Sequence, residues 1–191
     1  MKILEDRILN DGKIFPGDVL KVDSFVNHQI DIPFMNELAK EIFRLYRDSG
    51  VNKILTIEAS GIAMASLVAL QFNCPLVFAK KSKTSNIADN LYTAEVASYT
   101  HKNVNTIVVS KDYINNEDNI LIVDDFLAKG NALKGLIEIS EKAGAKVSGA
   151  AIIIEKQYQG GGDLIRKTGV RVESLAKVKS MSDDGKIEFT E

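Results

Sequence analysis

Short apolar runs alternate with helical patterns along most of the chain from residue 50 onward. Each run is rich in β-forming residues and is bounded by polar or turn residues, which is typical of a buried strand. These runs predict strands at residues 53–57, 76–79, 106–110, 120–123, 150–154 and 172–178. The apolar spacing predicts helices over residues 36–49, 62–72 and 131–143. Gly50 and Gly144 follow the first and the last of these helices, where glycine is favoured.

The order of these elements indicates the fold class. Strand, helix and strand in succession predict parallel strands joined by right-handed crossovers. Continuous apolar runs indicate a sheet that is covered on both faces. We therefore expect an α/β protein, a doubly wound and mainly parallel sheet with helices on both faces, in a single domain over residues 1–191. Two segments lie outside this pattern: residues 1–35 show no clear periodicity, and residues 80–105 form a long polar connection of the kind that often acts as a flexible lid.

Composition narrows the class of protein. The chain has 191 residues, 45% of them hydrophobic and 26% charged, with a net charge of −2. These values are those of an ordinary globular protein and give no basic field that would favour nucleic acid or an anionic membrane as a partner. Cys74 is the sole cysteine, so no intrachain disulfide can form. No apolar run is long enough for a signal peptide or a membrane span, and we expect a cytoplasmic protein.

The sharpest chemical signal is the segment 120–132, in which a strand delivers two adjacent carboxylates to its end. Asp124 and Asp125 follow four apolar residues, and Gly130 precedes a helix that begins at Asn131. The first turn of a helix attracts an anion, so acids beside it suit a ligand that carries both hydroxyls and a phosphate. A ribose 5-phosphate is such a ligand. The alternative is an ordinary strand that leads into a helix capped by the acids.

This segment resembles the phosphoribosyl pyrophosphate (PRPP) signature of the type I phosphoribosyltransferases, enzymes that transfer phosphoribosyl groups. The resemblance implies that Asp124 and Asp125 face the ribose hydroxyls in the catalytic centre. It also implies that the 5′-phosphate is held by Ala128, Lys129, Gly130, Asn131 and Ala132. Two features depart from the usual pattern. Relatives often carry Thr or Ser at the positions of Lys129 and Ala132, and Ala128 matches the adenine-type relatives, whereas those that use hypoxanthine and guanine carry Asp there.

A second strand-to-helix loop resembles the pyrophosphate-binding loop of the same family. It carries Ser60 and Gly61 where the family often has a basic residue beside the glycine. We expect Lys80 and Lys81, after the next strand, to neutralise pyrophosphate. The alternative is an ordinary tight turn. Mg²⁺ is expected to bind through the oxygens of PRPP, since nothing in the sequence forms a dedicated metal cage, and neither His28 nor His101 is read as a ligand.

Within the family, the chain is most similar to the branch that uses xanthine. The segments 20–31, 89–96 and 154–159 carry this resemblance. It implies that residues 1–35 and a C-terminal part form a hood over the base, with Leu20, Asn27 and Lys156 as the xanthine-binding residues. A lysine donates to an oxo group and favours the acidic xanthine ring, whereas it meets the amino group of adenine donor to donor. The alternative is that Lys156 is a solvated lysine at a strand end.

Further expectations concern the lid and the partners. Glu95 lies in the 80–105 segment and is a candidate acceptor for a purine proton, although it could equally face solvent on a hairpin. The family resemblance implies a homodimer. We expect His28 to pack in the hood, residues 115–119 to form a solvated turn and residues 160–162 a flexible connection. Two other functions are alternatives: an adenine or guanine/hypoxanthine phosphoribosyltransferase, or a purine-responsive regulator on the same fold. Such a regulator carries an extra N-terminal DNA-binding domain, for which we expect no room before residue 36.

Overall fold

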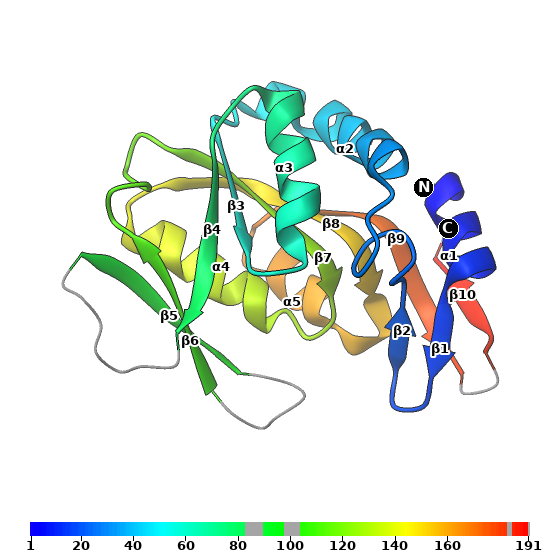
Figure 1. Cartoon of the computed structure of the whole chain (residues 1–191). Helices are drawn as coiled ribbons and strands as arrows, with labels where there is room; N and C mark the ends of the chain where they lie inside the picture. Colours follow the sequence, from blue (N-terminus) through cyan, green and yellow to red (C-terminus); the bar gives the residue numbers. More distant parts are fainter. Residues whose placement is uncertain (83–89, 98–103, 183–184, 191) are drawn as a thin grey trace.

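The computed structural model describes residues 1–82, 90–97, 104–182 and 185–190 of the chain. An eight-stranded sheet runs through the centre of the described part, in the order β10-β9-β8-β7-β3-β4-β6-β5 (Figure 1). Its strands are β3 (Lys53–Ile57), β4 (Leu76–Ser82), β5 (Leu91–Ala97), β6 (Val104–Ser110), β7 (Asn119–Leu127), β8 (Lys146–Lys156), β9 (Val172–Met181) and β10 (Ile187–Phe189).

The five inner strands, from β9 to β4, are parallel, which confirms the predicted α/β class with a mainly parallel sheet. The two edges are antiparallel. Strand β6, at the predicted position 106–110, pairs antiparallel with β4 and β5, because no crossover helix precedes it. Strand β9 corresponds to the last strand that the sequence pattern predicted, and β10, which was not predicted, returns beside it and pairs antiparallel.

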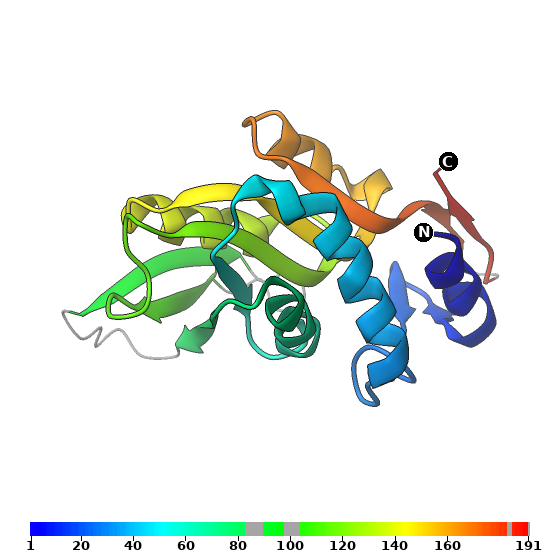
Figure 2. The ribbon, with the colours of Figure 1, turned by 90° about the horizontal axis from the view of Figure 1, so that it is seen from above.

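Helices cover both faces of the sheet, as the continuous apolar runs predicted (Figure 2). Helices α2 (Ile32–Tyr46) and α3 (Gly61–Phe72) lie on one face, and α4 (Asn131–Lys142) and α5 (Gly161–Arg166) on the other. Successive residues of a strand point to opposite faces, so Ile54 joins the core under α2 and α3 while Leu55 joins the core under α4. This double burial is why the strands lack a polar face.

The N-terminal region has more structure than the sequence pattern predicted. It forms helix α1 (Lys2–Asp11) and a hairpin of two short strands, β1 (Lys13–Phe15) and β2 (Val19–Lys21). Its buried side chains join the core of the α2–α3 face: Leu4, Ile8, Leu20, Val22, Phe25 and Val26. Helix α2 also begins earlier than predicted, because the Asp31 carboxylate accepts the N–H of Phe34 at 3.2 Å and caps its first turn.

Two local expectations were wrong and a third held in part. Residues 115–117 are exposed in a turn before β7, as predicted for 115–119, although Asp118 is buried and its carboxylate lies 2.7 Å from the Lys53 ammonium. Residues 160–162 are no loose connection: Gly161 and Gly162 are buried and begin α5. His28 is exposed rather than packed in the hood.

Much of the predicted lid, residues 83–89 and 98–103, lies outside the described residues. The described remainder belongs to β4, β5 and β6. None of the helices in the described residues is long and apolar enough to cross a membrane.

Candidate active site

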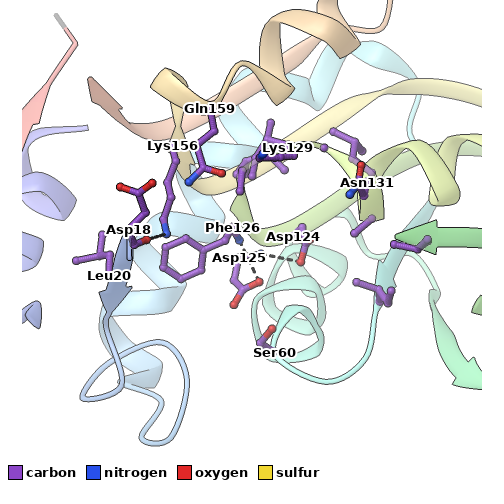
Figure 3. A pocket seen from close by; sticks show the side chains of 18 of the residues that line it. Asp18, Leu20, Ser60, Asp124, Asp125, Phe126, Lys129, Asn131, Lys156 and Gln159 are labelled. Atoms are coloured by element: carbon purple, nitrogen blue, oxygen red, sulfur yellow. Dashed lines mark hydrogen bonds between the residues drawn. The ribbon is translucent and has the colours of Figure 1, made fainter. Parts of the chain in front are cut away.

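A cavity of about 510 Å³ opens at the carboxyl ends of β3, β7 and β8, the edge where ligands bind in a doubly wound sheet. Figure 3 shows the side chains that line it. Many of the predicted site residues lie together in its wall: Leu20, Ser60, Lys81, Asp124, Asp125, Ala128, Lys129, Gly130, Asn131, Ala132 and Lys156. The sequence motifs on separate elements therefore belong to one site.

The acidic pair is held by the last residues of β7. Both carboxylates are buried, with 6% of Asp124 and 8% of Asp125 exposed. The N–H of Asp125 donates to Asp124 Oδ1 at 3.0 Å, and the N–H of Phe126 donates to Asp125 Oδ1 at 3.0 Å (Figure 3). Burial raises the pKa of Asp124 well above its ordinary value, and the charge of Asp125 raises it further. The site therefore favours a ligand that supplies hydroxyl donors or a cation to these oxygens.

The loop after β7 turns the chain into α4. Gly130 has a φ of +79° and immediately precedes the first residue of that helix. Such a conformation favours glycine, and the first turn of a twelve-residue helix presents its N–H groups to the cavity. An anion is stabilised at this position by hydrogen bonds and by the helix dipole. The arrangement suits a phosphate group close to the acidic pair.

The loop after β3 brings Ser60 and Glu58 to the opposite wall. Gly61 lies behind the acidic pair: a Cβ there would stand 2.2 Å from Thr56 Oγ1 and 3.2 Å from Asp124 Oδ1. A larger residue would clash first with Thr56 and so disturb the packing behind Asp124; Gly61 itself lies outside the described lining of the cavity. The backbone N–H of Lys81 donates to Glu58 Oε1 at 2.6 Å and joins this loop to the end of β4.

The two candidate lysines are separated by the alternation of the strand. Lys81 lines the cavity, whereas Lys80 points to the other side of β4. There its ammonium lies 5.9 Å from the centroid of the Phe78 ring, in a second hollow between β4 and β6. The structure thus brings one of the pair to the site, and a direct pyrophosphate contact of Lys80 finds no support in this arrangement.

The base side of the cavity is formed by segments far apart in the sequence. The Lys156 ammonium donates to the backbone carbonyl of Asp18 in the β1–β2 turn and lies 5.7 Å from the centroid of the Phe126 ring (Figure 3). Leu20 is buried beside them. Burial lowers the pKa of Lys156, and the Asp18 carboxylate partly opposes this change. An apolar ring face next to a desolvated ammonium suits a flat, electron-rich ring.

Besides Lys80 and Gly61, two further predicted residues do not line the cavity. Asn27 is exposed and lies outside its described lining. Glu95 is exposed on β5 between buried Ala94 and Val96, and it is Val96 that lines the cavity. The roles assigned to both residues stay predictions.

The structure also adds lining residues that the sequence reasoning missed, namely Glu58, Asp18, Phe126, Asn105 and Gln159. Phe126 and Gln159 lie inside motifs already singled out, directly after Asp125 and three residues after Lys156. Their position beside chemically marked residues was the available signal.

Fold and site together define a class. A doubly wound sheet whose central strand ends in an acidic pair, followed by a glycine loop at a helix N-terminus, is a site for a phosphorylated ribose. The family described as "Phosphoribosyl transferase domain" matches residues 22–174 of the chain. The structure is also similar to that of the adenine phosphoribosyltransferase from Giardia lamblia complexed with 9-deazaadenine, with a TM-score of 0.78 at 20% identity over 91% of this chain and 97% of that one. This second likeness supports the fold.

Close relatives in sequence place the chain more narrowly. Xanthine phosphoribosyltransferase from Finegoldia magna is 48% identical over 98% of both chains. The protein of the same name from Lachnoclostridium phytofermentans is 50% identical over 99% of this chain and 98% of its own. The chain belongs to the phosphoribosyltransferase family, in its xanthine phosphoribosyltransferase branch.

Proposed function

We propose that the chain transfers the 5-phosphoribosyl group of PRPP to xanthine, which yields xanthosine 5′-monophosphate and pyrophosphate, a reaction of purine salvage. The observation that carries this proposal is the single cavity in which the acidic pair and the 128–132 loop lie across from Lys156. A phosphorylated ribose fits the first two, and an oxopurine fits the last. The close relatives are named for this activity, and they are similar to the chain over nearly their full length.

The ribose half of the site acts mainly by position and charge. Asp124 and Asp125 accept hydrogen bonds from the ribose 2′- and 3′-hydroxyls, and the start of α4 holds the 5′-phosphate. The reaction centre C1′ gains positive charge as pyrophosphate departs, and two fixed carboxylates nearby stabilise that charge. Ser60 and Lys81 lie on the wall where the pyrophosphate would leave.

The base half selects the purine. The Lys156 ammonium donates to an oxo group and favours the ionised form of xanthine, while Phe126 offers a ring face beside it. An amino group at the same place would leave two donors facing each other. That mismatch costs about 1–3 kcal/mol, which disfavours adenine by roughly tenfold to hundredfold.

Mg²⁺ fits the site as a cation carried by the substrate. The described residues contain no cluster of three ligating side chains that would hold a metal ion alone. Two buried carboxylates with a raised pKa at Asp124 are nonetheless a suitable environment for a hard cation bound to PRPP oxygens. Its chemistry there is to neutralise the leaving pyrophosphate.

Three further parts of the proposal rest on the sequence rather than on the structure, and the family resemblance supports only the homodimer and the role of Glu95 among them. The protein acts in the cytoplasm, it forms a homodimer, and the 80–105 segment closes over the substrates with Glu95 in reach of the purine. Light scattering of the purified chain tests the homodimer, and a mass of a single chain at micromolar concentration would remove it.

Nucleotide formation tests the function directly. The protein is incubated with PRPP, Mg²⁺ and each of xanthine, guanine, hypoxanthine and adenine, and the nucleotides are resolved by chromatography. We expect the highest kcat/KM with xanthine and the lowest with adenine. Preferred formation of adenosine monophosphate would overturn the reading of Lys156, and formation of no nucleotide would overturn the activity.

A further inference from the structure

Gln159 is a polar residue in the cavity wall to which the proposed reaction assigns no role. It ends the short helix η2 (Gln157–Gln159), which joins β8 to the glycines at the start of α5. Figure 3 shows its amide reaching into the cavity between Lys156 and Lys129. It therefore lies between the residue that meets the base and the loop that holds the phosphate.

The amide of Gln159 is incompletely paired. Its Oε1 atom is buried, and no residue of the described chain donates a hydrogen bond to it. A buried carbonyl without a donor is unfavourable, and water or a ligand normally satisfies it. Rotation about the last torsion of the side chain exchanges Oε1 with the amide nitrogen, so a donor in the cavity can be met without any change of backbone.

The place of Gln159 is stable because the backbone around it is tied to the phosphate loop. The N–H of Gly161 donates to the carbonyl of Ala128 at 3.1 Å. Next along the chain, Gly162 packs on Glu155, whose carboxylate is bound by both terminal nitrogens of Arg166 at 2.8 and 2.7 Å. Gln159 is thus fixed relative to both halves of the site.

The geometry of a nucleotide identifies the facing edge of the purine. In the common anti conformation the C8–N7 edge lies on the same side as the 5′-phosphate, and N7 adjoins the 6-oxo group. A residue between Lys156, which meets an oxo group, and the phosphate loop therefore faces N7. Neutral xanthine carries a proton there when N9 is free to attack.

We propose that Gln159 is a specificity-determining residue whose amide oxygen accepts a hydrogen bond from N7–H of the incoming base, an inference that rests on the proposed function. This contact selects the xanthine tautomer in which N9 holds the free lone pair, because the other tautomer presents no N7 donor. Every common purine can adopt an N7–H tautomer, so the contact fixes the tautomer and orientation of the base, while Lys156 selects the oxo group beside N7.

The test compares two unreactive or poorly reactive analogues. In 9-deazaxanthine the N7–H is permanent, and in 7-deazaxanthine a carbon replaces N7. Their dissociation constants are measured by calorimetry in the presence of ribose 5-phosphate, for the wild type, Gln159→Met and Gln159→Glu. Met is close in size to Gln but lacks the acceptor, and Glu keeps it.

We expect the wild type to prefer 9-deazaxanthine, and Gln159→Met to lose roughly tenfold to hundredfold of that preference. Gln159→Glu should retain it, while 7-deazaxanthine should bind all three proteins within about threefold. An unchanged preference in Gln159→Met would overturn the inference, as would an equal loss in Gln159→Glu. A wild type that turns over no xanthine would instead refute the proposed function, so the two failures are distinguishable.

Discussion

The two halves of the cavity are built in different ways. The ribose and phosphate half comes from one continuous segment, the end of β7, the 128–132 loop and the start of α4. The base half comes from the β1–β2 turn and the end of β8, which touch where Lys156 binds the carbonyl of Asp18, together with the Phe126 ring of β7. Residues 18 and 156 are distant in the chain, so only folding brings them together.

This difference in construction determines how firmly the side chains of each half are held in position. A strand buried on both faces holds the acidic pair in place, and the local backbone sets the loop. The hairpin that supports Lys156 is short and largely exposed, with only Leu20 of its two strands buried. Changes on the ribose side should therefore abolish the chemistry, whereas changes on the base side should alter selectivity and pH dependence.

The largest effect is expected from replacing both acids. Asp124→Asn together with Asp125→Asn keeps the shape but removes the charge that, in the proposed reaction, stabilises C1′ in the transition state. Loss of fixed electrostatic groups at a reaction centre costs on the order of 10³-fold in kcat. Steady-state nucleotide formation measures it. Turnover within about tenfold of the wild type would refute the placement of ribose beside these carboxylates.

A stability measurement is the control for that variant. The pKa of Asp124 is raised in the folded state, so the carboxylate of Asp124 binds a proton more tightly in the folded protein than in the unfolded chain. The contribution to stability is full below the ordinary pKa and is lost as pH rises through the raised value. Asp124→Asn alone should therefore raise the Tm near pH 7 and lose this advantage near pH 4. A lower Tm near pH 7 would show that the carboxylate is structural.

The contrast also explains what the sequence could predict. Each inner strand and each helix of 36–49, 62–72 and 131–143 carries its own hydrophobic pattern, so the parallel core was predictable. Strands β1 and β2 have three residues each, too few for a periodic signal, and their partner surface is distant in the chain.

The direction in which side chains on a strand point is the second feature that the sequence could not predict. Glu95 and Val96, like Lys80 and Lys81, are neighbours on one strand, and a shift of one residue exchanges the face they occupy. No local feature of the sequence decides which neighbour faces the cavity. Packing decides it: Val96 and Ala94 are buried, which turns Glu95 outward in this structure.

Replacing Gly161, which lies next to the phosphate loop, is expected to have an intermediate effect on activity. A Cβ there would stand 2.3 Å from the carbonyl oxygen of Ala128 and 2.6 Å from the backbone nitrogen of Gly130. Gly161→Ala must therefore displace the phosphate loop, and a displacement of about 1 Å can cost roughly 10²-fold. We expect kcat/KM for PRPP to fall by about tenfold to hundredfold.

The neighbouring glycine is a matched control. Gly160 has a φ of +75°, and a Cβ there would meet nothing within 4 Å. Gly160→Ala should lower the free energy of unfolding by about 1 kcal/mol through backbone strain but leave the KM for PRPP nearly unchanged. Equal losses of PRPP use in the two variants would show that the glycines act through stability alone.

The smallest effect concerns the charge of Lys156. Burial lowers the pKa of this ammonium, so the charge is lost at a lower pH than for an ordinary lysine. In the wild type, kcat/KM for xanthine should fall as pH rises through that value, by about tenfold per unit beyond it. Lys156→Arg retains its charge over the whole range, since the pKa of arginine exceeds about 12. Its activity is expected to be lower throughout, because a guanidinium has a different shape.

The ionisation of xanthine affects both enzymes equally and cancels in the ratio of their kcat/KM values. That ratio, wild type over Lys156→Arg, should be constant at low pH and decline on the alkaline side, while the same ratio for PRPP stays flat. A xanthine ratio that is flat at all pH values would contradict a desolvated, base-binding ammonium at Lys156.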